Sequence, residues 1–132
     1  MSQENVEIVR WLYEQFRERK EPPWEVFAPD FEFDVSAVLP DGGSTRGRKA
    51  AEEVMGSYIG MFDDFHVAVE AVLASDDGQV VTAVRDGGTM KGTNAEVWNR
   101  FFHVFAIHDG EVTRWATFLD KGAALEAAGL SE

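Results

Sequence analysis

Two side chains in this sequence have the chemical type and surroundings to move a proton. Asp34 ends a short segment, Phe31 to Val35, in which apolar and acidic residues alternate. A carboxylate in apolar surroundings has its charged form disfavoured, which raises its pKa toward values useful to a general base. The alternative is a structural interpretation, in which Asp34 is a hydrogen-bonded residue at a strand end, capping a turn near Ser36.

His103 is the second candidate, and strand parity predicts that its side chain points inward. It shares one face of a predicted strand with three residues, Asn99, Phe101 and Phe105. From that position the imidazole could donate a proton or pair with Asp34. The alternative is a core histidine whose ring nitrogen bonds a backbone carbonyl or a tyrosine.

The remaining motifs carry less chemistry. Residues 42–49 resemble a phosphate-binding loop, but the Lys and Ser/Thr are misplaced for phosphate and magnesium. His66 and His108 lack the spacing of metal ligands, so we expect no metal and no cofactor. Trp115 is the tryptophan most suited to contact a ligand, because parity places it with Thr117 on the predicted concave face of the sheet.

Composition limits the classes of partner. The 132 residues include 24 acidic and 12 basic side chains, for a formal net charge of −12. This charge repels phosphate backbones and anionic membranes, so nucleic-acid and membrane-surface roles are disfavoured. The absence of cysteine excludes disulfides and thiol chemistry. The polar N-terminus is not a signal peptide and no apolar run could cross a bilayer, so we expect a cytoplasmic protein.

Periodicity predicts the helices that must position these side chains. A first helix has apolar residues at helical spacing, namely Val9, Leu12, Tyr13 and Phe16. Pro22-Pro23 ends this helix, and one short turn follows near Trp24. A second amphipathic helix begins at about Arg48. Its predicted buried face consists of Ala51, Val54, Met55, Tyr58 and Phe62. A short closing helix runs from Asp120 through Ala128.

From residue 65 onward the apolar period changes to two, which predicts four strands at 65–74, 79–90, 95–108 and 111–119. Asp76-Asp77-Gly78 and Asp109-Gly110 are tight-turn signals between them. Residues 40–44 are also rich in turn formers. The strand from residue 95 is apolar or aromatic on both faces. One face can pack on the helices, and the other needs a partner subunit.

The order of these elements resembles the nuclear transport factor 2-like superfamily, and within it the SnoaL-like proteins. The resemblance is carried over nearly the whole chain by residues 9–16, 27–34, 45–50, 100–104, 108–112 and 118–120. It implies one α+β domain over residues 1–132, in which a curved antiparallel sheet wraps around N-terminal helices to form a cone. It also implies a homodimer that forms through the convex face of the sheet.

The same resemblance implies roles for the two candidate residues. In ketosteroid-isomerase-like relatives, Asp34 aligns with the proton-shuttling Asp, and His103 aligns with a neutral acid that hydrogen-bonds the substrate oxygen. The essential Tyr of those relatives aligns with Leu12, and Tyr13 lies one position along, about 100° around the helix. Tyr13 either substitutes for that Tyr or is a core residue.

Two further mechanisms of the superfamily need a catalytic side chain or spacing that this chain lacks. Polyketide-cyclase-like relatives keep an acid–base Asp where this chain has Thr117. Epoxide-hydrolase-like relatives need an Arg and an Asp two positions apart on one strand. Arg85 and Asp86 are adjacent, so we expect them to point to opposite faces.

Two functional hypotheses remain. The first is a cone that holds a small, mostly apolar, oxygen-bearing molecule and catalyses cofactor-free proton transfer of isomerase, cyclase or hydratase type, with Asp34 as base and His103 as oxyanion partner. The second is a non-catalytic small-molecule-binding or dimerisation domain. A cone plugged by aromatic side chains would favour the second. The predicted ligand-binding residues are Tyr13, Leu12, Phe31, Tyr58, Asn99, Phe101, Phe105, Trp115 and Thr117.

Overall fold

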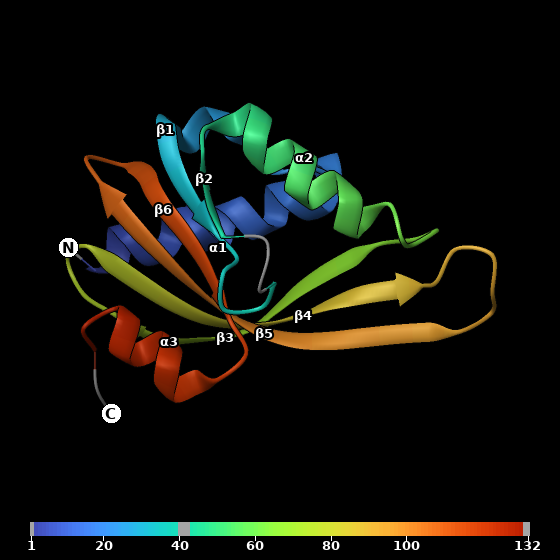
Figure 1. Ribbon diagram of the computed structural model, residues 1–132. Coiled ribbons are helices and arrows are strands. Elements are labelled where there is room, and N and C mark those ends of the chain that lie inside the picture. Colours follow the sequence, from blue (N-terminus) through green and yellow to red (C-terminus); the bar gives the residue numbers. More distant parts are fainter. Residues whose placement is uncertain (1, 40–42, 131–132) are drawn as a thin grey trace.

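A curved sheet with helices on both faces forms the framework of the chain (Figure 1). The computed structural model describes residues 2–39 and 43–130. In chain order the elements are α1 (Ser2–Arg19), the 3-10 turn η1 (Trp24–Val26), β1 (Phe27–Asp34), β2 (Ser44–Arg46), α2 (Arg48–Ile59), β3 (His66–Ser75), β4 (Gln79–Thr89), β5 (Glu96–His108), β6 (Glu111–Phe118) and α3 (Lys121–Ala127).

The six strands form one open sheet in the order β2-β1-β6-β5-β4-β3. The predicted α+β class with a curved sheet and N-terminal helices is confirmed. The sheet is mixed rather than wholly antiparallel, because β1 runs parallel to β6. That parallel pair follows from the connection: α2 and four strands separate β1 from β6, so no tight turn forces them to run in opposite directions.

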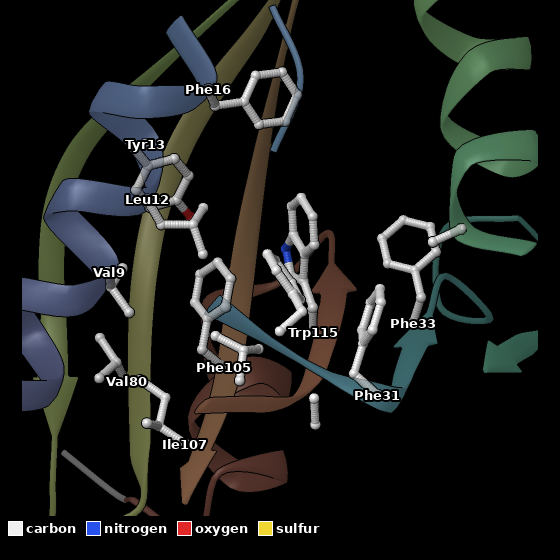
Figure 2. Close-up of a cluster of buried hydrophobic side chains, with 14 of the residues drawn as sticks. Val9, Leu12, Tyr13, Phe16, Phe31, Phe33, Val80, Phe105, Ile107 and Trp115 are labelled. Atoms are coloured by element: carbon white, nitrogen blue, oxygen red, sulfur yellow. The ribbon is translucent and has the colours of Figure 1, made fainter. Parts of the chain in front are cut away.

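Helix α1 supplies much of the core on the concave side of the sheet. Val9, Leu12 and Tyr13 are buried, as the helical spacing predicts. Figure 2 shows these side chains pointing from α1 toward Val80 and Phe105 in the sheet. Burying one such apolar side chain stabilises the fold by about 1.5–3 kcal/mol, so this face fixes α1 against the sheet. None of the helices in the described ranges is long and apolar enough to span a membrane.

Helix α2 is shorter than predicted. It ends at Ile59, where Gly60 donates a hydrogen bond back to the carbonyl of Gly56. Phe62 is therefore not on its buried face, and instead it forms an isolated bridge with Met90. The short edge strand β2 was not predicted, and only its first residue, Ser44, falls within the predicted turn at residues 40–44. Residues 40–42 of that turn lie outside the described part of the chain.

The second apolar face of β5 is covered in part by the chain itself. Val81, Val104 and Ala116 form a smaller core with two residues of α3, Ala124 and Leu125. The closing helix thus occupies part of the face for which a partner subunit was predicted. The homodimer itself stays a prediction.

Candidate functional site

A cavity of about 190 Å³ lies between the concave face of the sheet and helices α1 and α2. It is somewhat larger than an engineered protein cavity of about 150 Å³ that holds benzene, which corresponds to a molecule of one or two rings. The lining is mostly apolar. Its polar members are Tyr13, Tyr58, Asp86, His103 and Thr117, and no Lys or Arg is among the described residues that line it.

Asp86 is the carboxylate that the fold brings to this cavity. On β4 it continues the buried face formed by Val80, Thr82 and Val84, whereas Arg85 points to the opposite, exposed face as predicted. The Asp86 side chain is 7% exposed and accepts a hydrogen bond of 2.5 Å from the Tyr58 hydroxyl. Burial raises its pKa to about 6, although the Tyr58 hydrogen bond acts in the opposite direction.

The Tyr58 side chain extends from α2 to Asp86, and a residue of the sheet hydrogen-bonds its hydroxyl. Asn99 lies opposite Asp86 in the β4–β5 register and donates to the Tyr58 oxygen at 3.0 Å. Burial and the neighbouring carboxylate raise the pKa of the Tyr58 hydroxyl above its ordinary value. The hydroxyl therefore stays protonated at neutral pH and can donate to Asp86.

Two glycines after Asp86 allow close backbone packing at this site. Gly87 and Gly88 have φ angles of 149° and 151°, a region that side chains disfavour. A Cβ on Gly87 would lie 1.9 Å from the carbonyl oxygen of Val97, and one on Gly88 would lie 1.9 Å from that of Asp64. The Gly-Gly pair thus lets β4 lie against β5 on one side and against the segment just before β3 on the other.

His103 lies in the cavity wall and is also a buried, hydrogen-bonded histidine. Its side chain is 6% exposed, and its Nδ1 lies 2.7 Å from the Tyr13 hydroxyl. The same hydroxyl is 2.8 Å from Thr82 Oγ1. Burial lowers the pKa of His103 to about 3, so the ring is neutral at physiological pH. Nε2, the other ring nitrogen, has no hydrogen-bond partner within the described ranges, yet it is not sealed from the cavity.

Asp34 does not line the cavity, which corrects the prediction that it sits in apolar surroundings. Its neighbours Phe33 and Val35 line the cavity, so strand alternation turns Asp34 to the other face of β1. There it accepts hydrogen bonds from Ser36 and pairs with Arg114 at 2.8 Å. Partial burial acts to raise its pKa, but the Ser36 and Arg114 hydrogen bonds outweigh that effect and hold the pKa below its ordinary value. The structural interpretation, a strand-end Asp bonded near Ser36, describes this arrangement.

The predicted ligand-binding residues divide into two groups. The structure brings five of them to the cavity: Tyr13, Tyr58, Phe101, Trp115 and Thr117. It places the other four outside the lining: Leu12, Phe31, Phe105 and Asn99. The first three of these are core residues less than 2% exposed, and the fourth acts through Tyr58. The aromatic residues therefore narrow the cone without plugging it.

The polar groups of the cavity form two separate clusters. The Asp86 end contains Asp86 and Tyr58, and the His103 end contains His103, Tyr13 and Thr117. In the β4–β5 register Asp86 lies opposite Asn99, and His103 lies opposite Thr82. The two ends are thus four residues apart along the strands, or about 13 Å at the usual rise.

Sequence reasoning noted Asp86 only as a neighbour of Arg85 and did not select it as a site residue. A usable signal was present, since Val80, Thr82 and Val84 alternate with it on a face that parity joins to His103. Tyr58 was selected from the helical spacing, but its contact with Asp86 was not predictable, because that contact joins elements that are 28 residues apart.

Known structures share this fold at low sequence identity. TerC co-crystallised with polyporic acid is 19% identical, with a TM-score of 0.73 over 96% of this chain and 98% of that chain. A putative SnoaL-like polyketide cyclase from Jannaschia sp. CCS1 is 21% identical, with a TM-score of 0.72 over 99% and 95% of the two chains. A hypothetical protein with a ketosteroid isomerase-like fold from Catenulispora acidiphila DSM 44928, in complex with trimethylamine, is 17% identical, with a TM-score of 0.68 over 95% of this chain and 94% of that chain.

The family itself is shown by sequence. No curated protein matches the chain in a sequence comparison. A family model described as a SnoaL-like domain, however, matches residues 9–115, which is most of its length. Cavity, fold and sequence match agree, and the chain belongs to the SnoaL-like domain family.

Proposed function

We propose that the cavity binds a small, mostly apolar, oxygen-bearing molecule and that Asp86 catalyses cofactor-free proton transfer on it. The observation that carries this proposal is a buried carboxylate, with a pKa near 6, in the wall of an otherwise apolar cavity. A base whose pKa lies near the working pH is ionised in most molecules and still binds a proton strongly enough to remove one from carbon. Asp86 thus replaces Asp34 as the proposed base.

The two oxygens of Asp86 suit the two tasks of such a base. Oδ1 accepts the Tyr58 hydrogen bond, which fixes the orientation of the carboxylate. Oδ2 has no hydrogen-bond partner among the described residues. It would take a proton from a carbon that is conjugated with a carbonyl group through a double bond, and return it to another carbon of the same molecule. Atoms and charge balance without any added reactant, which suits an isomerase or cyclase type of reaction.

His103 has the proposed role of oxyanion partner at the far end of the cavity. Removal of a proton from a conjugated ketone leaves a negative charge that is delocalised over the conjugated atoms. A neutral imidazole that carries a proton on Nε2 can donate a hydrogen bond to the oxygen where that charge accumulates. The Tyr13 hydroxyl at Nδ1 favours that arrangement when it donates its proton to the ring.

Deuterium exchange tests the proposal before the natural substrate is known. We would incubate 2-tetralone, a two-ring ketone, with the protein in D₂O and follow loss of the protons next to its carbonyl by NMR. Wild-type protein should accelerate the exchange, and Asp86→Asn should abolish the acceleration. Asp34→Asn is the matched control and should keep it. Equal acceleration by wild type and Asp86→Asn would exclude Asp86 as the base.

A second candidate function is non-catalytic binding of a small amine. Tyr58 and Phe101 lie edge to face, with ring centroids 6.4 Å apart, and both line the cavity with Asp86. A carboxylate beside aromatic rings attracts alkylated ammonium ions, and a protein of the same fold was crystallised with trimethylamine. If this function holds, trimethylamine binds above pH 6, binding weakens as Asp86 is protonated, and Asp86→Asn loses it.

A further inference from the structure

Thr117 presents an unpartnered hydroxyl in the wall of the cavity. The residue lines the cavity and is only 8% exposed. Its Oγ1 has no hydrogen-bond partner in residues 2–39 and 43–130, yet the atom is not fully enclosed by protein. Most polar groups that a fold buries to this extent are hydrogen-bonded, so a free one calls for an explanation. A ligand in the cavity is a partner that this hydroxyl can reach.

The hydroxyl lies beside a second unpartnered polar atom of this wall, Nε2 of His103. Thr117 and His103 are opposite each other in the antiparallel register of β5 and β6, and both line the cavity. Opposed residues on one face of a sheet have Cβ atoms about 4.5–5.5 Å apart. The Tyr13 hydroxyl lies 2.7 Å from Nδ1, so Nε2 is the ring nitrogen that is left for a ligand. Two unpartnered polar atoms thus face the cavity from neighbouring strands, at the same level of the sheet.

Both groups can donate a hydrogen bond while they stay uncharged. A threonine hydroxyl carries one proton on a rotatable bond, and a neutral imidazole donates from Nε2 when Nδ1 accepts. Nδ1 can accept from Tyr13, because Thr82 Oγ1 lies 2.8 Å from the Tyr13 oxygen and can donate to it. A consistent set of proton positions therefore leaves Thr117 and His103 as a pair of neutral donors.

A pair of neutral donors suits a carbonyl oxygen better than other ligand oxygens. A carbonyl oxygen has two lone pairs and no proton, so it can accept from both groups at once. A ligand hydroxyl also carries a proton, for which two donors provide no acceptor. A carboxylate or phosphate would need a counter-charge, but no Lys or Arg is among the described residues that line the cavity, and Asp86 does line it.

We propose that Thr117 Oγ1 and His103 Nε2 donate hydrogen bonds to one carbonyl oxygen, and that Thr117 makes the cavity selective for neutral ketones. This inference rests on the proposed function, in which His103 already faces the ligand oxygen, and it adds Thr117 as the second donor. It concerns binding and does not depend on whether Asp86 transfers a proton.

Three matched probes test the pair by binding alone. Tetralin, 2-tetralol and 2-tetralone share one two-ring skeleton and carry no oxygen, a hydroxyl and a carbonyl, respectively. We would measure their Kd values by calorimetry with wild-type protein, Thr117→Val and the control Thr113→Val. Thr113 is on the same strand but is not among the residues that line the cavity, and it bonds the carbonyl oxygen of Ala106. Thr117→Val should fold, because valine keeps the shape of threonine and Thr117 gives up no protein hydrogen bond.

Thr117→Val should weaken the binding of 2-tetralone by about two- to tenfold, which is the usual net contribution of one hydrogen bond. It should leave the Kd of tetralin unchanged and weaken 2-tetralol less than 2-tetralone. Thr113→Val should change none of the three Kd values, and Thr117→Ser, which keeps the hydroxyl, should bind 2-tetralone as wild type does. An unchanged Kd of 2-tetralone in Thr117→Val, or an equal loss for either of the other probes, would overturn the proposal.

A carbon-13 label at the carbonyl of 2-tetralone reports its hydrogen bonds directly. The NMR signal of a carbonyl carbon moves downfield as its oxygen accepts hydrogen bonds, so it should lie farther downfield in the wild-type complex than in Thr117→Val. If Thr117→Val does not fold, the His103 Nε2–H signal of wild type supplies a readout, and it should move with 2-tetralone and not with tetralin. Identical carbonyl signals, an unmoved Nε2–H signal, or failure of 2-tetralone to bind wild type would overturn the proposal. Binding with these shifts but without deuterium exchange would remove only the proposed catalysis.

Discussion

Replacement of Asp86 by Asn should stabilise the fold at neutral pH while it removes the proposed activity. In the unfolded chain the carboxyl has its ordinary pKa of 3.8, and in the folded protein burial raises it to about 6. The folded state therefore binds more protons than the unfolded state between these values, and its stability falls as pH rises through that window. A shift of about two units corresponds to a penalty of about 3 kcal/mol, which is fully present above pH 6.

Asparagine resembles the protonated carboxyl, since its side-chain oxygen can still accept the Tyr58 hydrogen bond and it never ionises. Urea unfolding at pH 4, 6 and 8 should show Asp86→Asn close to wild type at pH 4. At pH 8 the variant should be more stable by up to about 3 kcal/mol, which is roughly 10 °C in Tm for a chain of this size. A stability difference that does not change with pH would refute the reasoning.

Asp34→Asn is the control, because its effect on stability should have the opposite sign and the opposite pH dependence. The folded-state pKa of Asp34 is depressed by Ser36 and Arg114, so its contribution to stability is present above its unfolded pKa and is lost as pH falls. This variant should be less stable than wild type at pH 7, and the difference should shrink in acid. The two carboxylates thus give opposite pH dependences in one experiment.

Three further predictions concern other residues. Gly87→Ala should destabilise the protein by more than about 2 kcal/mol in urea, because its Cβ would meet the Val97 carbonyl oxygen at 1.9 Å, and a fully stable variant would contradict that geometry. The His103 ring signals should stay constant in NMR spectra between pH 5 and 8, since burial lowers its pKa to about 3, and a titration in that range would show a charged ring. Sedimentation equilibrium should give the mass of a homodimer, and a single-chain mass at micromolar concentration would remove the predicted convex interface.

The strands were predictable because their signals are local. Asp76-Asp77-Gly78 and Asp109-Gly110 mark two hairpins, and the predicted ends of β3 to β6 fall within one residue of those observed. The first strand is longer than predicted, because β1 begins at Phe27 rather than Phe31. The parallel pairing of β1 with β6 was not predictable from periodicity, which is the same for both directions. Phe62 shows a second limit, because the helical spacing continues past Gly60 while the helix does not.

The candidate site was predicted in part. Strand parity explains both the correct placement of one residue and the wrong placement of the proposed base. Parity placed His103 in the cavity wall correctly. The same rule applied to Phe33 and Val35 would have turned Asp34 outward, and applied to Val84 it would have turned Asp86 inward. The hydrogen bond between Tyr13 and His103 joins residues 90 positions apart, so no local pattern contains it.

The hydrogen bond from Tyr58 to Asp86 joins α2 to β4, so the carboxylate also fixes α2, one wall of the cavity, against the sheet. While Asp86 is ionised, the bond is charge-assisted and holds the helix firmly against the sheet. Once Asp86 has taken a proton, the bond becomes neutral and weaker. We expect helix α2 to open more often in that state, so that a single proton would set both the chemical step and the residence time of the bound molecule.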